Sequence, residues 1–184
     1  VMSHAAEKCE FANRLAAKNN IDEVLHTDVK KLGEALAKDF VEESTKKECQ
    51  VILVMAGFPC KGLSRNRIDN LPNKGFDHKE SGLFTEIPRI LSLLKRLAKP
   101  RGIEVHHIVE NVKMEKKEHD YICSIPNGIP IMIQASRCCA ASRPRLFWRS
   151  FEVTPLEGEC FEKNDKTNDL YMKRNHTKSW QTSR

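Results

Sequence analysis

The sequence predicts an α/β fold in which a mostly parallel sheet carries helices on both faces. Apolar, β-branched runs such as 51–56 have the character of buried strands, and stretches with apolar residues at helical spacing lie between them. Strands that alternate with helices usually build a parallel sheet. With 184 residues and 40% hydrophobic content, the chain is long enough and apolar enough for one such domain.

The helices and strands of the first half follow from the helical spacing of apolar residues and from short apolar runs. Phe11, Leu15 and Ala16 recur at helical spacing and indicate a helix over about 7–18. The next elements in chain order are a strand at 23–26, a helix at about 31–43 and the strand at 51–56. Residues 61–80 are rich in Lys, Arg, Asn, Asp and Gly and show no period, so we expect a long, mobile loop there.

The second half continues the alternation. An apolar stripe that includes Leu83, Ile87 and Leu94 predicts a helix over about 82–98, which Pro100 ends. The remaining elements are a strand at 104–109, a strand at about 130–135 and its antiparallel partner at 145–151. Residues 156–184 are polar and almost without apolar period, so we expect a domain over 1–152 followed by an irregular tail over 153–184.

Composition excludes several classes of protein. The net charge of +6 mildly favours a polyanionic partner. No apolar run approaches the ~20 residues of a membrane span, so no membrane association is expected. The seven cysteines form no Cys-x-x-Cys pair, which favours the reduced thiols of a cytosolic or nuclear protein over a disulfide framework or a zinc ribbon. His106 and His107 would point to opposite faces of a strand, so we expect no metal site there.

Reactive side chains follow the predicted strands. Cys60 and Glu110 fall at the carboxyl ends of two strands, and Asp28 follows another. Open α/β sheets bind their ligands at this edge, so a cleft would bring these side chains together. The candidate catalytic residues are a thiol, a carboxyl, an amide and two guanidinium groups: Cys60, Glu110, Asn111, Arg143 and Arg145.

Taken one at a time, these residues have ordinary explanations. A cysteine after a strand is more often a small core residue than a nucleophile. A Glu-Asn pair after a strand ordinarily forms a turn, and an Arg-x-Arg pair in a basic protein is ordinarily a solvated face. Their ordered combination at plausible separations favours a catalytic site.

Over roughly residues 3–152, the same segments resemble the motifs of DNA cytosine-5 methyltransferases. The matching motifs are Gly57-Phe58-Pro59-Cys60 with Ser64, Gly82-Leu83-Phe84 with Glu86, Glu110-Asn111-Val112, and the arginine motif from Ala140 to Trp148. The arginine motif is most similar to that of the animal de novo branch, in which small residues also precede the arginines.

The resemblance implies a Rossmann-like, S-adenosylmethionine-dependent methyltransferase fold and a covalent mechanism. The thiolate of Cys60 would attack C6 of cytosine, while Glu110, with its geometry fixed by Asn111, stabilises the adduct at N3. Arg143 and Arg145 share one face of a strand start, where one would hold the base carbonyl at O2 and the other would brace the cysteine loop.

The resemblance also implies a cofactor and a nucleic-acid partner. Glu7 looks like the acid that binds the ribose hydroxyls of S-adenosylmethionine, Asp28 looks like the acid that meets its adenine, and Pro59 belongs to the same cofactor site. The expected contacts to phosphates are Ser64, Arg65 and Arg67. The substrate would be duplex DNA with the target cytosine flipped out, which implies a nuclear protein in a eukaryote. Homo- or hetero-oligomers of the parent enzyme are compatible with this assignment.

The chain also departs from the family pattern. It contains no Gly-x-Gly, so the Phe-x-Gly-x-Gly loop that cradles the methionine part of the cofactor is missing, together with the strand before it. In the family that strand lies mid-sheet, between the strands that correspond to 23–26 and 51–56. We therefore expect a partial catalytic domain that is inactive and binds the cofactor poorly on its own. Two alternatives stay open, namely tRNA cytosine-5 methylation on the same scaffold and a catalytically inactive regulatory homologue.

Overall fold

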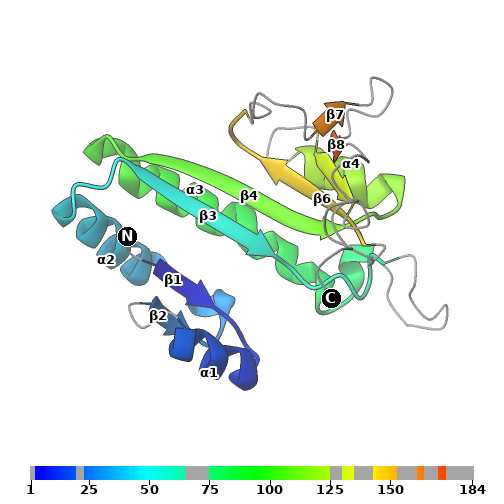
Figure 1. The fold of residues 1–184 in the computed structure, drawn as a ribbon. Helices are drawn as coiled ribbons and strands as arrows, with labels where there is room; N and C mark the ends of the chain where they lie inside the picture. Colours follow the sequence, from blue (N-terminus) through cyan, green and yellow to red (C-terminus); the bar gives the residue numbers. More distant parts are fainter. Residues whose placement is uncertain are drawn as a thin grey trace, which may run out of the picture. The chain divides into compact units, whose positions relative to one another are not determined.

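The computed structural model describes residues 3–19, 23–64, 75–124, 130–134, 143–152, 161–163 and 170–172. The chain divides into two compact units. The first consists of Val1–Ile52 and Glu86–Val105, and the second consists of Leu53–Thr85 and His106–Arg184. Figure 1 shows the helices and strands that build them. In the part of the chain that the structure describes, no helix is long and apolar enough to cross a membrane.

The first unit begins with two parallel strands, β1 (Ser3–Ala6) and β2 (Glu23–His26), joined by helix α1 (Glu10–Asn19). Their register places Ser3 opposite Glu23. The predicted helix and the predicted strand at 23–26 are both confirmed. β1 is not among the predicted strands, because Ser-His-Ala-Ala contains no β-branched residue and four residues are too few to show a period. Pairing with β2 is what makes this segment a strand.

Two helices complete the first unit, α2 (Glu34–Lys46) and α3 (Glu86–Ala98), and they pack against each other. The buried stripe of α3 recurs at helical spacing and consists of Ile87, Leu91, Leu94 and Ala98. The Arg89 guanidinium donates a hydrogen bond to the Leu32 carbonyl at 2.9 Å. Both helices begin later than predicted, because short 3₁₀ helices occupy Val29–Lys31 before α2 and Ser81–Thr85 before α3.

Most of a four-stranded sheet in the order β3-β4-β6-β5 belongs to the second unit, and the first two residues of β3 and of β4 belong to the first. Its strands are β3 (Val51–Gly57), β4 (Glu104–Val112), β5 (Ile131–Gln134) and β6 (Pro144–Arg149). β3 and β4 run in the same direction, and β6 is antiparallel to both of its neighbours (Figure 1). The mixed α/β fold is consistent with a Rossmann-like methyltransferase domain, and the predicted antiparallel pairing near the end of the sheet is confirmed.

β4 is longer than the sequence predicts. Glu110 and Asn111 were expected to follow the strand, but they lie within it. The reason is β6, which places Phe147 opposite Glu110 and Leu146 opposite Asn111. A Glu-Asn pair often begins a turn when no partner strand is present, and here the ladder of hydrogen bonds keeps it extended.

The core of the second unit is built around aromatic side chains. Trp148 of β6 is fully buried, and its indole N–H donates to the sulfur of Cys123 at 3.2 Å. Cys123 belongs to α4 (Lys116–Ser124), a helix that the sequence analysis does not predict. A second cluster packs around Phe58, the residue that follows β3, and its other members are Phe76, Phe84 and Tyr121. It anchors the loop that follows this strand.

Two predicted irregular segments contain regular structure. Within 61–80, residues 65–74 lie outside the described residues, but Gly75–Asp77 forms a 3₁₀ helix. Within the expected tail, β7 (Phe161–Lys163) and β8 (Leu170–Met172) form a short antiparallel pair. The sequence analysis does not predict these three-residue elements, because they show no period of their own.

One side of β3 carries exposed apolar side chains. Val51, Leu53 and Met55 alternate along the strand and are 50%, 49% and 72% exposed. Among the described strands, β3 is also the end of its sheet, so one edge of its backbone has no neighbouring strand. An apolar strand at an open edge favours pairing with another strand and predisposes a chain to aggregate.

Candidate active site

A tight turn presents Cys60 at the end of β3. The Cys60 carbonyl accepts hydrogen bonds from the amides of Leu63 at 2.9 Å and Ser64 at 2.8 Å, which fold the chain back after the cysteine. The Cys60 side chain is half-buried. Phe58 precedes it, is 8% exposed and packs on Phe84 with ring centroids 4.9 Å apart. The thiol therefore sits on a short loop with an aromatic anchor.

Two buried polar side chains hold this loop in place. The Asn111 amide is 1% exposed and donates to the Phe58 carbonyl at 2.9 Å. The Ser81 hydroxyl, which is fully buried, donates to the Pro59 carbonyl at 3.2 Å and accepts from the Gly62 amide at 3.0 Å. Buried backbone carbonyls need such partners, so both side chains contribute to the loop's conformation.

We expect Asn111 to help orient Glu110 and an arginine to brace the cysteine loop, and both roles stay predictions. The hydrogen bonds that the structure shows to this loop come from Asn111 and from Ser81, which the sequence analysis does not single out. A lone serine in a polar segment gives no local signal of its partner, because Pro59 lies 22 positions away.

Gly62 shows how closely the loop is packed. A Cβ atom at this position would lie 2.5 Å from the Gly75 carbonyl oxygen and 2.5 Å from the Cβ of His78. The Gly75 amide also donates to the Gly62 carbonyl at 2.9 Å. Only glycine fits here without a shift of the backbone, so the loop after Cys60 is pinned to the 3₁₀ helix at 75–77.

Glu110 faces the same loop from β4. Its Oε1 atom lies 2.6 Å from Nε of Arg145, and the two side chains are 35% and 21% exposed. Its Oε2 atom would be 3.2 Å from a Cβ at Gly57, so any larger residue there would crowd the carboxylate. Arg145 thus orients Glu110, a contact that β6 makes possible by pairing with β4.

A pocket of about 210 Å³ opens between these groups. Its lining consists of Gly57, Phe58, Pro59, Cys60, Glu110, Asn111, Val112, Arg143 and Arg145. The structure therefore brings all five predicted catalytic side chains to one place. Arg143 is exposed at its rim. A thiol, a carboxyl group and two guanidinium groups around a small cavity can support addition of a nucleophile to a planar, polar ring.

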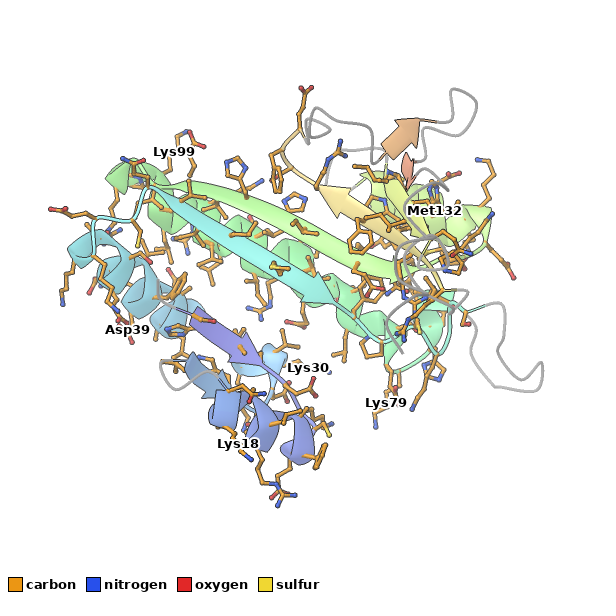
Figure 2. The ribbon with its side chains drawn as sticks, viewed as in Figure 1. Lys18, Lys30, Asp39, Lys79, Lys99 and Met132 are labelled. Carbon is orange, nitrogen blue, oxygen red and sulfur yellow. The ribbon has the colours of Figure 1, made fainter. Side chains whose placement is uncertain are left out.

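The predicted nucleic-acid contacts are described only in part. Ser64 is half-buried at the end of the Cys60 turn, and Arg65 and Arg67 lie outside the described residues. Lys61 projects from the loop and forms an ion pair with Glu80 at 2.9 Å. This hydrogen bond to Lys61 holds the pKa of the Glu80 carboxyl below its usual value. Figure 2 shows the neighbouring Lys79 pointing outward from the same segment.

The two predicted cofactor acids belong to the first unit. Glu7 follows β1, and its Oε1 atom accepts from the Cys9 amide at 2.7 Å. Asp28 follows β2 and caps the 3₁₀ helix at 29–31 by accepting from the Lys30 amide at 3.0 Å (Lys30 is labelled in Figure 2). β1 and β2 are parallel neighbours, so both carboxylates lie at the same edge of their sheet.

Among the described residues, no group of three or more His, Cys, Asp or Glu side chains is arranged to hold a metal ion.

Comparison with known proteins identifies the family. The family model of C-5 cytosine-specific DNA methylases matches residues 2–124, which is more than half of the chain. A comparison with curated proteins finds no match. The matched segment includes Cys60 and Glu110 and ends before the two arginines. The chain belongs to the C-5 cytosine-specific DNA methylase family, whose members are S-adenosylmethionine-dependent methyltransferases.

Proposed function

We propose that this chain carries the catalytic centre of a DNA cytosine-5 methyltransferase, with Cys60 as the nucleophile. The observation that carries the proposal is the pocket of about 210 Å³ in which Cys60, Glu110 and both arginines meet. The cavity suits one flipped-out base rather than a large ligand. The resemblance of the arginine motif supports a member of the animal de novo branch, and a eukaryotic member would act in the nucleus.

Cytosine C5 is itself a poor nucleophile, so the enzyme must first add a nucleophile of its own at C6. The Cys60 thiolate adds to C6, which forms the S–C6 bond and moves electron density to N3. Glu110 gives a proton to N3 and so neutralises the charge that develops there. C5 then receives a methyl group. Loss of the C5 proton to solvent, departure of the thiolate from C6 and return of the N3 proton to Glu110 restore the aromatic ring. The Arg145 guanidinium, 2.6 Å from Oε1, sets the orientation of Glu110 before the base arrives.

Arg143 is the better candidate for the base carbonyl. Arg145 is engaged with Glu110, whereas Arg143 is exposed at the pocket rim, just before β6 begins. A guanidinium group at this position can donate to O2 of a cytosine whose C6 faces Cys60. Asn111 and Ser81 keep the cysteine loop in place, and Ser64, Arg65 and Arg67 meet the flanking phosphates.

The cofactor acids fit the adenosine half of S-adenosylmethionine. Carboxylate oxygens accept hydrogen bonds from ribose hydroxyls and from the amino group of adenine, and Glu7 and Asp28 place such oxygens at one sheet edge. Pro59 lines the catalytic pocket and completes the proposed set. When bound, this cofactor supplies the electrophilic methyl group that C5 receives.

The decisive experiment measures transfer of a labelled methyl group to duplex DNA and to tRNA in parallel reactions. The protein is expressed from the whole reading frame that encodes residues 1–184, and residues 1–184 alone form a second sample. We expect label in DNA with the first sample and little or none with the second. Label in tRNA but not in DNA would overturn the substrate assignment. No label in either, from a sample that binds the cofactor, would establish an inactive homologue.

A further inference from the structure

Two histidines connect the strands that end in the proposed cofactor acids. Nδ1 of His4 in β1 lies 3.2 Å from Nε2 of His26 in β2. Their rings are stacked with centroids 5.4 Å apart and planes 28° from parallel. Both side chains are half-buried. The sequence analysis does not identify this pair, because 22 positions separate the two residues.

The surroundings of His4 disfavour a positive charge on its ring. Phe40 of α2 packs edge-on against the ring, with centroids 4.7 Å apart. Nε2 of His4 is buried and has no hydrogen-bond partner among the described residues. Burial lowers the pKa of His4, and a positive charge on His26 lowers it further, while Glu43 opposes the shift and Lys47 adds to it.

The hydrogen bond between the His4 and His26 rings can form only in some protonation states of the pair. An N–H···N bond needs one nitrogen with a hydrogen and one without it. A neutral pair and a singly protonated pair both satisfy this condition, whereas a doubly protonated pair does not. Two imidazolium groups at 3.2 Å also repel each other. The bond is therefore lost when both rings carry a positive charge.

The pair is linked directly to Glu7. The Glu7 amide donates to the carbonyl of His26 at 3.0 Å, and Ala6 lies opposite His26 in the strand register. Asp28 follows His26 by two residues. The His26 side chain thus bonds to His4, and the His26 carbonyl bonds to the Glu7 amide. Both contacts join β2 to β1 close to the carboxylates of Glu7 and Asp28.

We propose that His4 and His26 form a positioning pair that keeps the carboxylates of Glu7 and Asp28 at the spacing required by an S-adenosyl ligand. The inference rests on the proposed function, since that function assigns the ligand. The pair acts through the strand ends and touches no reacting atom.

The sign of the pH dependence follows from the lowered pKa of His4. Unfolded His4 takes up its proton near pH ~6.5. The stabilisation of the folded state by neutral His4 is complete above that pH. It is lost as the pH falls through the lower pKa that His4 has in the folded state. We expect affinity for the ligand to fall over the same window. The loss should be about two- to tenfold, the size of one neutral hydrogen bond.

The test follows residues 1–184 by NMR from pH 7.5 to 5.0. Over the same range, it measures how tightly the protein expressed from the whole reading frame binds S-adenosylhomocysteine. In the wild type, we expect the His4 ring and the Glu7 amide to shift together, with a midpoint below ~6.5. His4→Gln keeps a hydrogen-bonding group that does not titrate, so the Glu7 shift should disappear while affinity stays close to the wild type. His4→Phe removes the bond but keeps a ring against Phe40, so affinity should be low at every pH. His106→Gln, in the other unit, is the matched control and should retain the wild-type profile.

The outcomes separate the two proposals. A Glu7 amide that titrates identically in the wild type and in His4→Gln overturns the positioning pair. The positioning pair is also overturned if the affinity for S-adenosylhomocysteine depends on pH in His4→Phe as it does in the wild type. If the protein from the whole reading frame binds no S-adenosylhomocysteine at pH 7.5, the cofactor assignment of Glu7 and Asp28 is overturned. The ligand-free titration of the Glu7 amide in residues 1–184 still decides whether the two histidines control this strand end.

Discussion

Asn111 reaches across 53 positions of sequence to the carbonyl of Phe58, whereas Glu7 and Asp28 accept hydrogen bonds from amides only two residues away. Two side chains of the pocket have partners in distant segments: Asn111 bonds to the loop after β3, and Glu110 pairs with Arg145 of β6. The proposed cofactor acids are held by local turns and by the pairing of two short strands. The difference indicates that long-range contacts preorganise the pocket of the second unit, while mainly local contacts hold the two carboxylates of the first unit.

Of the substitutions that test this comparison, Cys60→Ser should have the largest effect on turnover. Cys60→Ser replaces the thiolate with a hydroxyl that is scarcely ionised, so turnover should fall below detection. DNA that contains 5-fluorocytosine should trap the wild-type protein as a covalent adduct, because the fluorine cannot leave as the C5 proton does, and the variant should form no adduct. Undiminished methylation by Cys60→Ser would refute the assignment of the nucleophile.

Glu110→Gln should have the next largest effect. Glutamine keeps the size of the side chain but cannot transfer a proton to N3, so turnover should fall by ~100–10,000-fold. The lost ion pair with Arg145 is partly exposed and contributes only about 0–1 kcal/mol, so the melting temperature should change little. Paired measurements of turnover and thermal unfolding check this. A large loss of stability with normal turnover would show that Glu110 has a structural role.

Asn111→Leu tests preorganisation directly. The change leaves the buried carbonyl of Phe58 without its donor, which costs about 1–3 kcal/mol. The free energy of unfolding and the rate of thiol labelling at Cys60 should both report a looser loop. Ser81→Ala removes the second brace and is the matched comparison, with an effect in the same direction. If both variants label Cys60 at the wild-type rate, these side chains do not control the loop.

Glu7→Gln probes the other side of the comparison. It removes the negative charge at the end of β1, and affinity for S-adenosylhomocysteine should fall by ~10–100-fold, the value of a hydrogen bond to a charged group. The Cys60 labelling rate should not change, because the pocket has its own braces. Asp39→Asn is the control, since it removes a charge of the same sign on α2. Equal losses of affinity in both variants would point to net charge rather than to a contact.

The smallest effect is expected at the ion pair beside the nucleophile. Glu80→Gln releases Lys61 and removes one negative charge from the loop segment. Affinity for duplex DNA should rise slightly at low salt, and the gain should disappear as salt screens the charges. Stability should not change measurably, because the pair is exposed. Binding titrations at two salt concentrations check this, and weaker DNA binding at low salt would contradict it.

The sequence alone determined the features that depend on local pattern. Hydrophobic periodicity and residue identity are local properties of the chain. The sequence therefore predicted the strand at 51–56, the apolar stripe of α3 and the motifs at Cys60 and Glu110. The motifs also led to the family that the comparison then showed. The roles of the individual site residues remain predictions.

Only the tertiary structure decided how these pieces hold one another. It made β1 a strand, extended β4 through Glu110 and placed the Asn111 amide against the carbonyl of Phe58. It also brought His4 onto His26. Each of these contacts joins residues that are far apart in the chain. Strand pairing and buried polar contacts depend on a partner whose position is set by the rest of the fold, so no local sequence pattern specifies them.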